Sequence, residues 1–206
     1  MRISKDYEER RNEILDTAEK LFTKKGYEKC TVNDILREIS IAKGTFYYYF
    51  KSKQEVLEAI VTRYTDFMMT KVQAVMNQDL QPEQKFMQVF LAMRINNEVG
   101  EEVLNEMHQP DNALLHQKTL QEIVEKIAPV LVEIIEEGID KNVWQCKYPL
   151  QYMQIFLASS LTLTDEGIFE MDADAQMNLG ALISLLEKML EVKEDFFMTM
   201  FLENWG

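Results

Sequence analysis

Apolar residues recur at intervals of three and four along most of the chain, which is the period of an amphipathic α-helix. The stretch from Tyr7 to Lys25 illustrates the pattern and ends before Gly26, a residue suited to a helix end. Its expected inward stripe consists of Ile14, Leu15, Ala18, Leu21 and Phe22. No β-alternation or internal repeat interrupts the pattern. We therefore predict an all-α fold of about nine helices.

Prolines, glycines and capping residues divide this helical pattern into segments. The nine helices are expected over residues 7–25, 32–39, 43–50, 53–78, 84–97, 101–108, 112–142, 150–169 and 173–190. A kink is expected at Pro129, and a break precedes the last apolar stretch, residues 196–201. Residues 1–52 should form one domain and residues 53–206 a larger one, with the helix over 53–78 connecting the two.

Three consecutive tyrosines between lysines mark the stretch from Lys43 to Lys53. If residues 43–50 form a helix, its period places Phe46, Tyr49 and Phe50 on an apolar face. The opposite face carries Lys43, Gly44, Thr45, Tyr47 and Tyr48. Ammonium and hydroxyl groups on that face suit the phosphates of a nucleic-acid groove, and tyrosine rings can contact thymine methyl groups.

A second short helix precedes the tyrosine helix. Thr31 is a good N-cap, and Asp34 stands at the third helical position as a short form of the capping box. A break over residues 40–42 then leads into the tyrosine helix, which we call the reading helix. This is the plan of a helix-turn-helix, although similar helix pairs also occur in proteins that do not bind DNA.

The net charge of −13 argues at first sight against a nucleic-acid binder, because neutralising phosphates provides most non-specific affinity. The distribution of charge along the chain, however, is compatible with nucleic-acid binding by the first third. Residues 1–65 contain 13 Lys and Arg against 11 Asp and Glu, a formal charge of +2, whereas the remainder carries −15. A basic first third and an acidic remainder fit a reading domain attached to a domain that is held off the duplex.

Residues 14–22 (ILDTAEKLF), Gly26-Tyr27 and residues 31–53 (TVNDILREISIAKGTFYYYFKSK) resemble the DNA-binding domain of TetR-type transcriptional regulators. The resemblance is in register over about residues 8–65, and the rest of the chain is similar only in helical character and length. Two positions depart from the family pattern. Ser40 stands where a turn glycine is usual, and Ala42 where a capping serine is common.

The resemblance supports DNA contact by the polar face of the reading helix and by residues beside it. Thr31 is chiefly a cap whose hydroxyl can also reach a phosphate, and Lys53 opens the next helix on the DNA side. The expected DNA-binding residues are Thr31, Lys43, Gly44, Thr45, Tyr47, Tyr48 and Lys53.

The helices over 150–169 and 173–190 carry more apolar surface than one inward stripe requires, around small residues that allow close helix approach. Pairing with a second copy would form a four-helix interface, which is also how the resembled family dimerises. The alternative is that both are core helices. The expected interface residues are Tyr152, Ile155, Ser159, Leu163, Leu179, Leu182, Ile183, Leu186 and Leu190.

A small-molecule effector is expected to bind within the larger domain, where methionine-rich walls adapt to varied apolar ligands. The candidate lining is Phe67, Met68, Phe86, Phe90, Met93, Arg94, Met107, Leu131 and Phe156. Stripes of this kind are also typical of plain core. Arg94 would favour an anionic ligand, and the surplus of acidic residues a cationic one, so the charge of the effector stays open.

Nothing in the sequence supports catalysis or a cofactor. No nucleophile elbow, phosphate loop or HExxH motif is present, and Cys30 and Cys146 lack partner spacing. His108 and His116 are eight residues apart across Pro110, which argues against a metal pair on one helix. No signal peptide or membrane-length apolar run is evident, so we expect a cytoplasmic protein without metal or membrane contact.

The sequence therefore favours a ligand-responsive transcriptional regulator, most simply a repressor. It would bind a palindromic, double-stranded DNA operator as a homodimer and leave it when an effector binds. The alternative is a helical small-molecule-binding or protein-interaction module that does not regulate DNA. An enzyme is the weakest of the three hypotheses.

Overall fold

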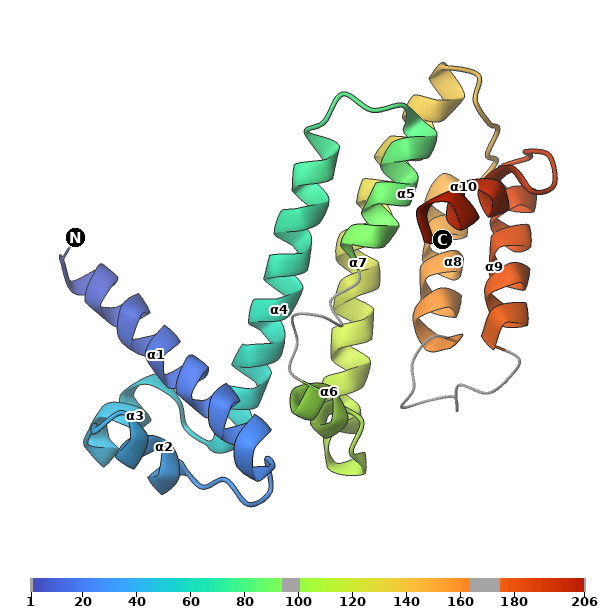
Figure 1. Cartoon of the computed structure of the whole chain (residues 1–206). Coiled ribbons are helices and arrows are strands. Elements are labelled where there is room, and N and C mark those ends of the chain that lie inside the picture. Colours follow the sequence, from blue (N-terminus) through green and yellow to red (C-terminus); the bar gives the residue numbers. More distant parts are fainter. Residues whose placement is uncertain (1, 94–100, 164–174, 206) are drawn as a thin grey trace. The chain divides into compact units, whose positions relative to one another are not determined.

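The computed structural model describes residues 2–93, 101–163 and 175–205, in which every regular element is helical. The all-α prediction is confirmed. The elements are α1 (Arg2–Lys25), α2 (Val32–Glu38), α3 (Lys43–Tyr49), α4 (Lys53–Met76), α5 (Pro82–Ala92), α6 (Glu101–Met107), the 3₁₀ helix η1 (Pro110–Asn112), α7 (Ala113–Asp140), α8 (Pro149–Leu163), α9 (Ala175–Met189) and α10 (Phe196–Trp205) (Figure 1).

The main differences from the predicted helices lie at their ends. The described ranges contain ten α-helices, because the apolar stretch expected after a break forms α10. α1 begins at Arg2 and not near Tyr7, and α5 runs from Pro82 to Ala92. α7 continues through Pro129 as far as Asp140.

The chain packs as two compact units. The first comprises Met1–Phe67 and Ile95–Thr119, and the second comprises Met68–Arg94 and Leu120–Gly206. α4 and α7 each run from one unit into the other. The first unit therefore includes α6 in addition to the helix-turn-helix, and α6 packs against α1.

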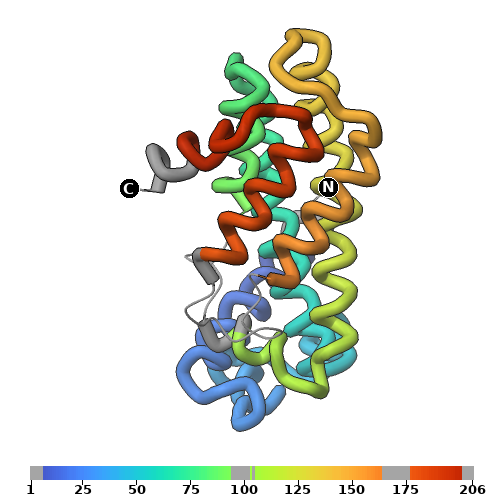
Figure 2. Tube along the Cα trace, turned by 90° about the vertical axis from the view of Figure 1, so that its right-hand side faces the viewer, coloured from blue at the N-terminus to red at the C-terminus, as the bar shows by residue number. Residues whose placement is uncertain are grey.

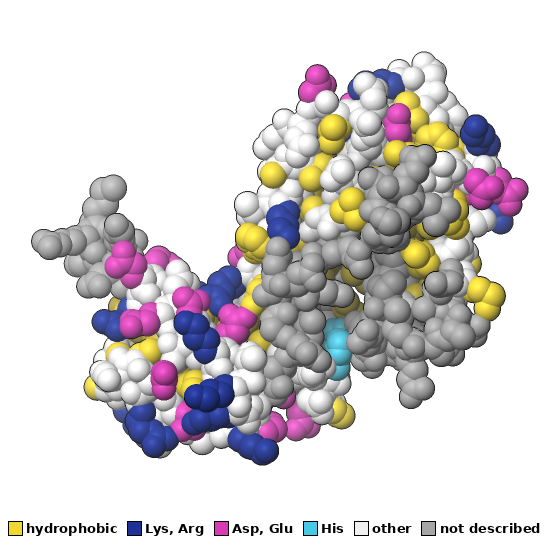
Figure 3. Space-filling model, viewed as in Figure 1, with side chains coloured by type: hydrophobic (Ala, Val, Ile, Leu, Met, Phe, Trp, Pro, Cys, Tyr) yellow, Lys and Arg dark blue, Asp and Glu magenta, His cyan; other side chains and the backbone are white. Residues whose placement is uncertain are grey.

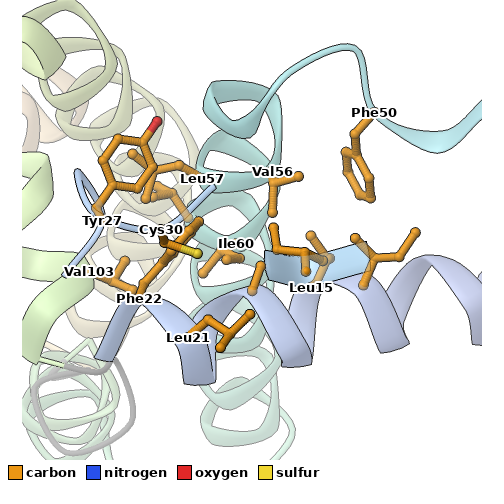
Figure 4. Packing of buried hydrophobic residues seen from close by; sticks show 14 of the residues in the cluster. Leu15, Leu21, Phe22, Tyr27, Cys30, Phe50, Val56, Leu57, Ile60 and Val103 are labelled. Carbon is orange, nitrogen blue, oxygen red and sulfur yellow. The ribbon is translucent and has the colours of Figure 1, made fainter. Parts of the chain in front are cut away.

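The core of the first unit gathers one apolar face from each of its helices. All five residues of the stripe predicted for the first helix are buried. In Figure 4, Phe22, Cys30 and Val103 gather at one end of the cluster, and Phe50 lies at the other. Val103 belongs to α6, so a helix distant in sequence closes this core.

The turn between α2 and α3 depends on a left-handed residue. Ser40 has φ 53°, its N–H donates to the carbonyl of Arg37, and the N–H of Ile41 donates to the carbonyl of Leu36 at 3.1 Å. These two bonds form a Schellman motif, which normally places glycine at the left-handed position. The structure thus gives the physical reason for a glycine at this position and shows that serine adopts the same conformation.

In the second unit, α8 and α9 lie side by side, as both Figure 1 and Figure 2 show. The buried carboxylate of Glu187 on α9 accepts hydrogen bonds from the backbone N–H groups of Asp195, Phe197 and Met198 at 3.2, 2.9 and 3.4 Å. These donors lie at the start of α10, where a helix leaves N–H groups unpaired. Glu187 thereby fixes α10 against α9.

Replacing Ser40 by glycine is expected to stabilise the protein by roughly 0.5–1 kcal/mol. A left-handed conformation costs a residue with a side chain about 1–2 kcal/mol, and the flexibility of glycine in the unfolded chain offsets part of this gain. Thermal unfolding followed by circular dichroism measures the effect. Ser40→Ala keeps the Cβ atom and should bring no gain. A Ser40→Gly protein that melts no higher than the parent would contradict the strain at this turn.

Candidate nucleic-acid interface

α3 has the two faces that its period predicts. Phe46 is completely buried, and Tyr49 is half-buried with its ring 4.7 Å from that of Tyr7 on α1. On the other side Tyr48 is 72% exposed and Tyr47 46% exposed. Lys43 and Gly44 are exposed as well, and Thr45 is half-buried.

The exposed tyrosines are held by neighbouring groups. The ring of Tyr48 meets those of Tyr7 and Tyr49 edge-on, at centroid distances of 5.8 and 5.1 Å. The ammonium of Lys43 lies 5.8 Å from the centroid of the Tyr47 ring, within the range of a cation–π interaction. The phenol groups are therefore presented to solvent on rings that the rest of the unit supports.

Packing within the chain does not require a glycine at position 44. A Cβ atom added there would meet nothing within 4 Å, so the position faces open space. Within a helix, glycine is less stable than alanine by roughly 0.5–1 kcal/mol, so its presence carries a small cost without an internal benefit. A close approach by an external molecule is a physical use for this position.

The N-terminus of α2 is closed by a reciprocal cap. The backbone N–H of Asp34 donates to the hydroxyl of Thr31 at 3.2 Å, and the hydroxyl and N–H of Thr31 donate to the Asp34 carboxylate at 2.7 and 3.0 Å. Lys25 at 3.0 Å and Arg37 also bind this carboxylate. The Thr31 bonds, followed by these cations, hold the pKa of Asp34 well below its usual range. Thr31 is thus a cap first, as expected.

Lys53 faces the loop after α1. Its ammonium donates to the carbonyl of Tyr27 at 2.6 Å and lies 3.8 Å from the centroid of the same residue's ring. The Tyr27 hydroxyl donates to Gln54 at 2.9 Å, and Gln54 donates to Asn112 at 3.0 Å. Burial, together with the nearby carboxylate of Glu106, raises the pKa of Tyr27 to about 12. The contact between Lys53 and Tyr27 could not be inferred from sequence spacing.

The residues expected to line an effector pocket fall into both units. Phe86 is fully buried, with ring centroids 5.3 Å from Phe90 and 5.4 Å from Phe197, and Phe90 lies 5.3 Å from Phe156. Met68 and Leu131 are also buried in the second unit, and Met93 is half-buried at the end of α5. Trp144, in the loop between α7 and α8, and Phe197, on α10, complete this aromatic cluster and were missed, because both lie far along the chain from α5.

The remaining three members of the expected pocket lie elsewhere. Met107 is buried in the core of the first unit, and Phe67, also in that unit, is 45% exposed. Arg94 lies outside the described residues. A surface cavity of about 500 Å³ occurs in the first unit, between the loop after α1 and the end of α6, with Tyr27 and Glu106 in its wall.

The residues expected at a dimer interface divide into buried and accessible sets. Four of them, on or directly after α9, are buried within one chain: Leu182, Ile183, Leu186 and Leu190. Tyr152, Ser159, Leu163 and Leu179 are half-buried, and Ile155 is 50% exposed. Met177 and Leu185 of α9 are exposed too. We call Ile155, Met177 and Leu185 the exposed apolar set.

The two histidines lie next to each other, which the sequence did not predict. The ring centroids of His108 and His116 are 5.0 Å apart. As expected, the two residues do not share a helix, because η1 at Pro110 separates α6 from α7. Among the described residues, no group of three or more histidine, cysteine or acidic side chains is arranged to hold a metal ion.

The surface of the first unit carries charges of both signs. In Figure 3, Lys and Arg side chains lie along the outer edge of this unit, among Asp and Glu. None of the helices within the described ranges has an apolar stretch long enough to cross a bilayer. A short helix with an accessible face of tyrosines and a lysine, positioned by a second helix and a tight turn, has the arrangement of a helix-turn-helix, the motif whose second helix enters the major groove in DNA-binding proteins.

Comparison with known families extends this assignment. The model for "Bacterial regulatory proteins, tetR family" matches residues 14–60, and that for "Tetracyclin repressor-like, C-terminal domain" matches residues 94–183. Together the two matches cover more than half of the chain. The chain belongs to the TetR family of transcriptional regulators.

Relatives and solved structures agree with the family. The repressor KstR2 of Mycolicibacterium smegmatis is 30% identical over 83 residues, 40% of each chain, and a helix-turn-helix regulator of Lactococcus lactis is 47% identical over 51 residues, 25% of this chain and 26% of that one. The matches span less than half the length of these relatives. A TetR/AcrR-family regulator from Thermobifida fusca has a TM-score of 0.59 at 21% identity, covering 88% of this chain and 97% of that one. This last likeness is one of fold.

The cap at Asp34 makes stability depend on pH. Because its pKa is lower in the folded protein than in the unfolded chain, the carboxylate contributes stability above about pH 4, and this contribution is lost as the pH falls further. Asp34→Asn should therefore lower the melting temperature at pH 7, with a difference that narrows in acid. Asp16→Asn, at an exposed carboxylate paired with Arg63, should change little. An equal effect of Asp34→Asn at both pH values would contradict the cap.

Proposed function

We propose that the protein is a ligand-responsive repressor that binds a palindromic DNA operator as a homodimer. Membership of the family establishes a DNA-binding transcriptional regulator, and the finer points rest on the structure of the individual units. The observation that carries the proposal is the exposed face of α3, on which Tyr47, Tyr48, Lys43 and Gly44 lie together. Because its ligand would be genomic DNA, we place the protein in the cytoplasm.

The groups on this face match the chemistry of a major groove. Lys43 supplies positive charge for phosphates, and the hydroxyls of Tyr47, Tyr48 and Thr45 can donate to phosphate oxygens or base edges. Gly44 removes the side chain that would hold the helix away from the bases. Thr31 would assist at the N-terminus of α2, and Lys53 would have to exchange its contact with Tyr27 for a phosphate.

Dimerisation is proposed through α8 and α9. Ile155, Met177 and Leu185 expose apolar side chains on this helix pair, and water contact with such surface is unfavourable. Small Ser159 and exposed Ala158 on α8 permit a second helix to approach closely. Two copies related by a twofold axis would cover the same surface on each other, and their reading helices would enter successive major grooves about 34–36 Å apart.

The effector is proposed to bind in the second unit, at the aromatic cluster of Phe86, Phe90 and Phe156. Methionines such as Met68 and Met93 could adjust to a ligand there. α4 and α7, which both continue into the first unit, would carry the change to α3. A coupling of about 1–3 kcal/mol between effector and operator is typical and is sufficient for a switch. Repression, and not activation, is proposed because the relative KstR2 is a repressor.

The alternative is a helical binding module that has kept the fold without regulating DNA. Salt-sensitive binding to the DNA upstream of its own gene distinguishes the two, because phosphate contacts release counterions. Such a module would bind heparin and DNA weakly and without preference for that sequence.

The reading face can be tested with a matched pair of sites. Tyr47→Ala should weaken binding to labelled upstream DNA by about 1–3 kcal/mol, and Lys43→Ala should lower the salt dependence by about one counterion per contact. Fluorescence anisotropy at several salt concentrations measures both.

The control for these DNA-binding measurements is a second lysine–tyrosine pair, whose tyrosine is as exposed as Tyr47. Lys147 lies 5.1 Å from the ring centroid of Tyr148, which is 47% exposed at the start of α8. Lys147→Ala and Tyr148→Ala should leave operator binding unchanged. If both pairs of variants bound like the parent, or if the α8 pair had the larger effect, α3 would not be the reading helix.

The dimer interface is tested with Ile155→Glu, which places a charge in the exposed apolar set. Burying an unpaired carboxylate is costly, so the variant should be monomeric in sedimentation velocity while its helical content is unchanged. Leu114→Glu, at a 63% exposed leucine in the first unit, is the control and should stay dimeric. A monomeric parent protein, or a dimeric Ile155→Glu variant, would overturn this interface.

A further inference from the structure

Tyr7, in the first turns of α1, packs against two tyrosines of the reading helix. Its ring centroid lies 5.8 Å from that of Tyr48 and 4.7 Å from that of Tyr49, and the Tyr48 and Tyr49 centroids are 5.1 Å apart. The three rings therefore form a closed triangle in which each ring contacts the other two. Tyr7 and Tyr49 are half-buried, whereas Tyr48 is 72% exposed.

We propose that Tyr7 is a positioning residue for operator recognition. Its ring holds the side chain of Tyr48 in one orientation, and without this contact the reading face discriminates less well between DNA sequences. The inference rests on the proposed function, because it takes Tyr48 to be a DNA contact. Tyr7 itself precedes the part of the chain that the model of the DNA-binding domain matches, which begins at residue 14.

Two rings fix the orientation of Tyr48. A long side chain on a helix has two common χ1 rotamers, and an exposed tyrosine without ring contacts would exchange between them. Tyr7 and Tyr49 meet the Tyr48 ring at interplanar angles of 78° and 89°, which is a favoured arrangement of aromatic pairs. A change of rotamer would carry the ring away from both partners. The hydroxyl of Tyr48 is thus presented in one direction before DNA binds, which lowers the entropy lost on binding.

Tyr7 reaches α3 because the inward face of α1 continues toward the start of that helix. Tyr7 and Arg11 are one turn apart, and the guanidinium of Arg11 lies 5.3 Å from the ring centroid of buried Phe50. The first turns of α1 therefore contact the reading helix at two separate points. Arg11 meets a ring on its core side, whereas Tyr7 meets the rings beside its reading face, so the two contacts can be removed independently.

NMR of the free protein tests whether Tyr7 orients Tyr48. Three-bond couplings about the Cα–Cβ bond of Tyr48 should report a single rotamer in the parent and in Tyr7→Phe, which keeps the ring. In Tyr7→Leu, which keeps apolar bulk without an aromatic ring, the couplings should be averaged between rotamers. Couplings in Tyr7→Leu that equal those of the parent would overturn the proposal. This measurement uses no DNA, so its outcome is independent of the proposed function.

Fluorescence anisotropy tests the consequence, as the ratio of the affinities for the upstream DNA and for an unrelated duplex of equal length. Tyr7→Leu should lower this ratio roughly two- to tenfold, the range that one aromatic contact allows, and Tyr7→Phe should keep it. In a Tyr48→Ala background Tyr7→Leu should cause no further loss, because Tyr7 acts through Tyr48. An unchanged ratio in Tyr7→Leu, or an equal loss in both backgrounds, would contradict the positioning role.

Arg11→Ala is the matched control, because it removes the other contact between the first turns of α1 and α3. This variant should keep both the affinity ratio of the parent and the single rotamer of Tyr48. An equal loss of discrimination in Arg11→Ala would mean a general loosening of α3 and would count against Tyr7. If the parent showed no preference for the upstream DNA, the proposed function would fail, whereas the couplings would still decide whether Tyr7 orients Tyr48.

Discussion

The burial of one face of α3 is the constraint on which the reading head depends. Phe46 and Phe50 insert into a core shared with α1, α4 and α6, and each large apolar side chain contributes about 1.5–3 kcal/mol on burial. A seven-residue helix would not persist alone in water, so this packing is what makes it a helix. Once the inner face is anchored, Lys43, Tyr47 and Tyr48 remain exposed on the outer face, where ring contacts support them and leave their polar groups accessible to a ligand.

Much of the first unit could be predicted because its helices and caps are determined by residues that lie close together in the sequence. The period of α1 identified the buried stripe, and the spacing of Thr31 and Asp34 identified the cap that the structure contains. The departure at Ser40 was visible in the sequence as well. Its left-handed φ became known only from the structure, because the same residue type fits many other turns.

The parts that could not be predicted depend on partners distant in sequence. α9 is apolar on more than one side, so periodicity could not decide that Leu182 and Leu186 face the core while Leu185 faces solvent. Likewise, the contact between Lys53 and Tyr27 and the meeting of His108 and His116 require a known path for the loops. For the same reason, the sequence could not place Trp144, in the loop after α7, and Phe197, on α10, against Phe86.

The most direct test of the central claim is to observe the tyrosine rings during DNA binding. NMR of the protein with isotope-labelled tyrosine, titrated with the DNA upstream of its own gene, reports each ring separately. The account predicts that the signals of Tyr47 and Tyr48 shift, while that of Tyr148, which is as exposed as Tyr47, stays in place. Unchanged signals of Tyr47 and Tyr48 in the saturated complex would contradict it.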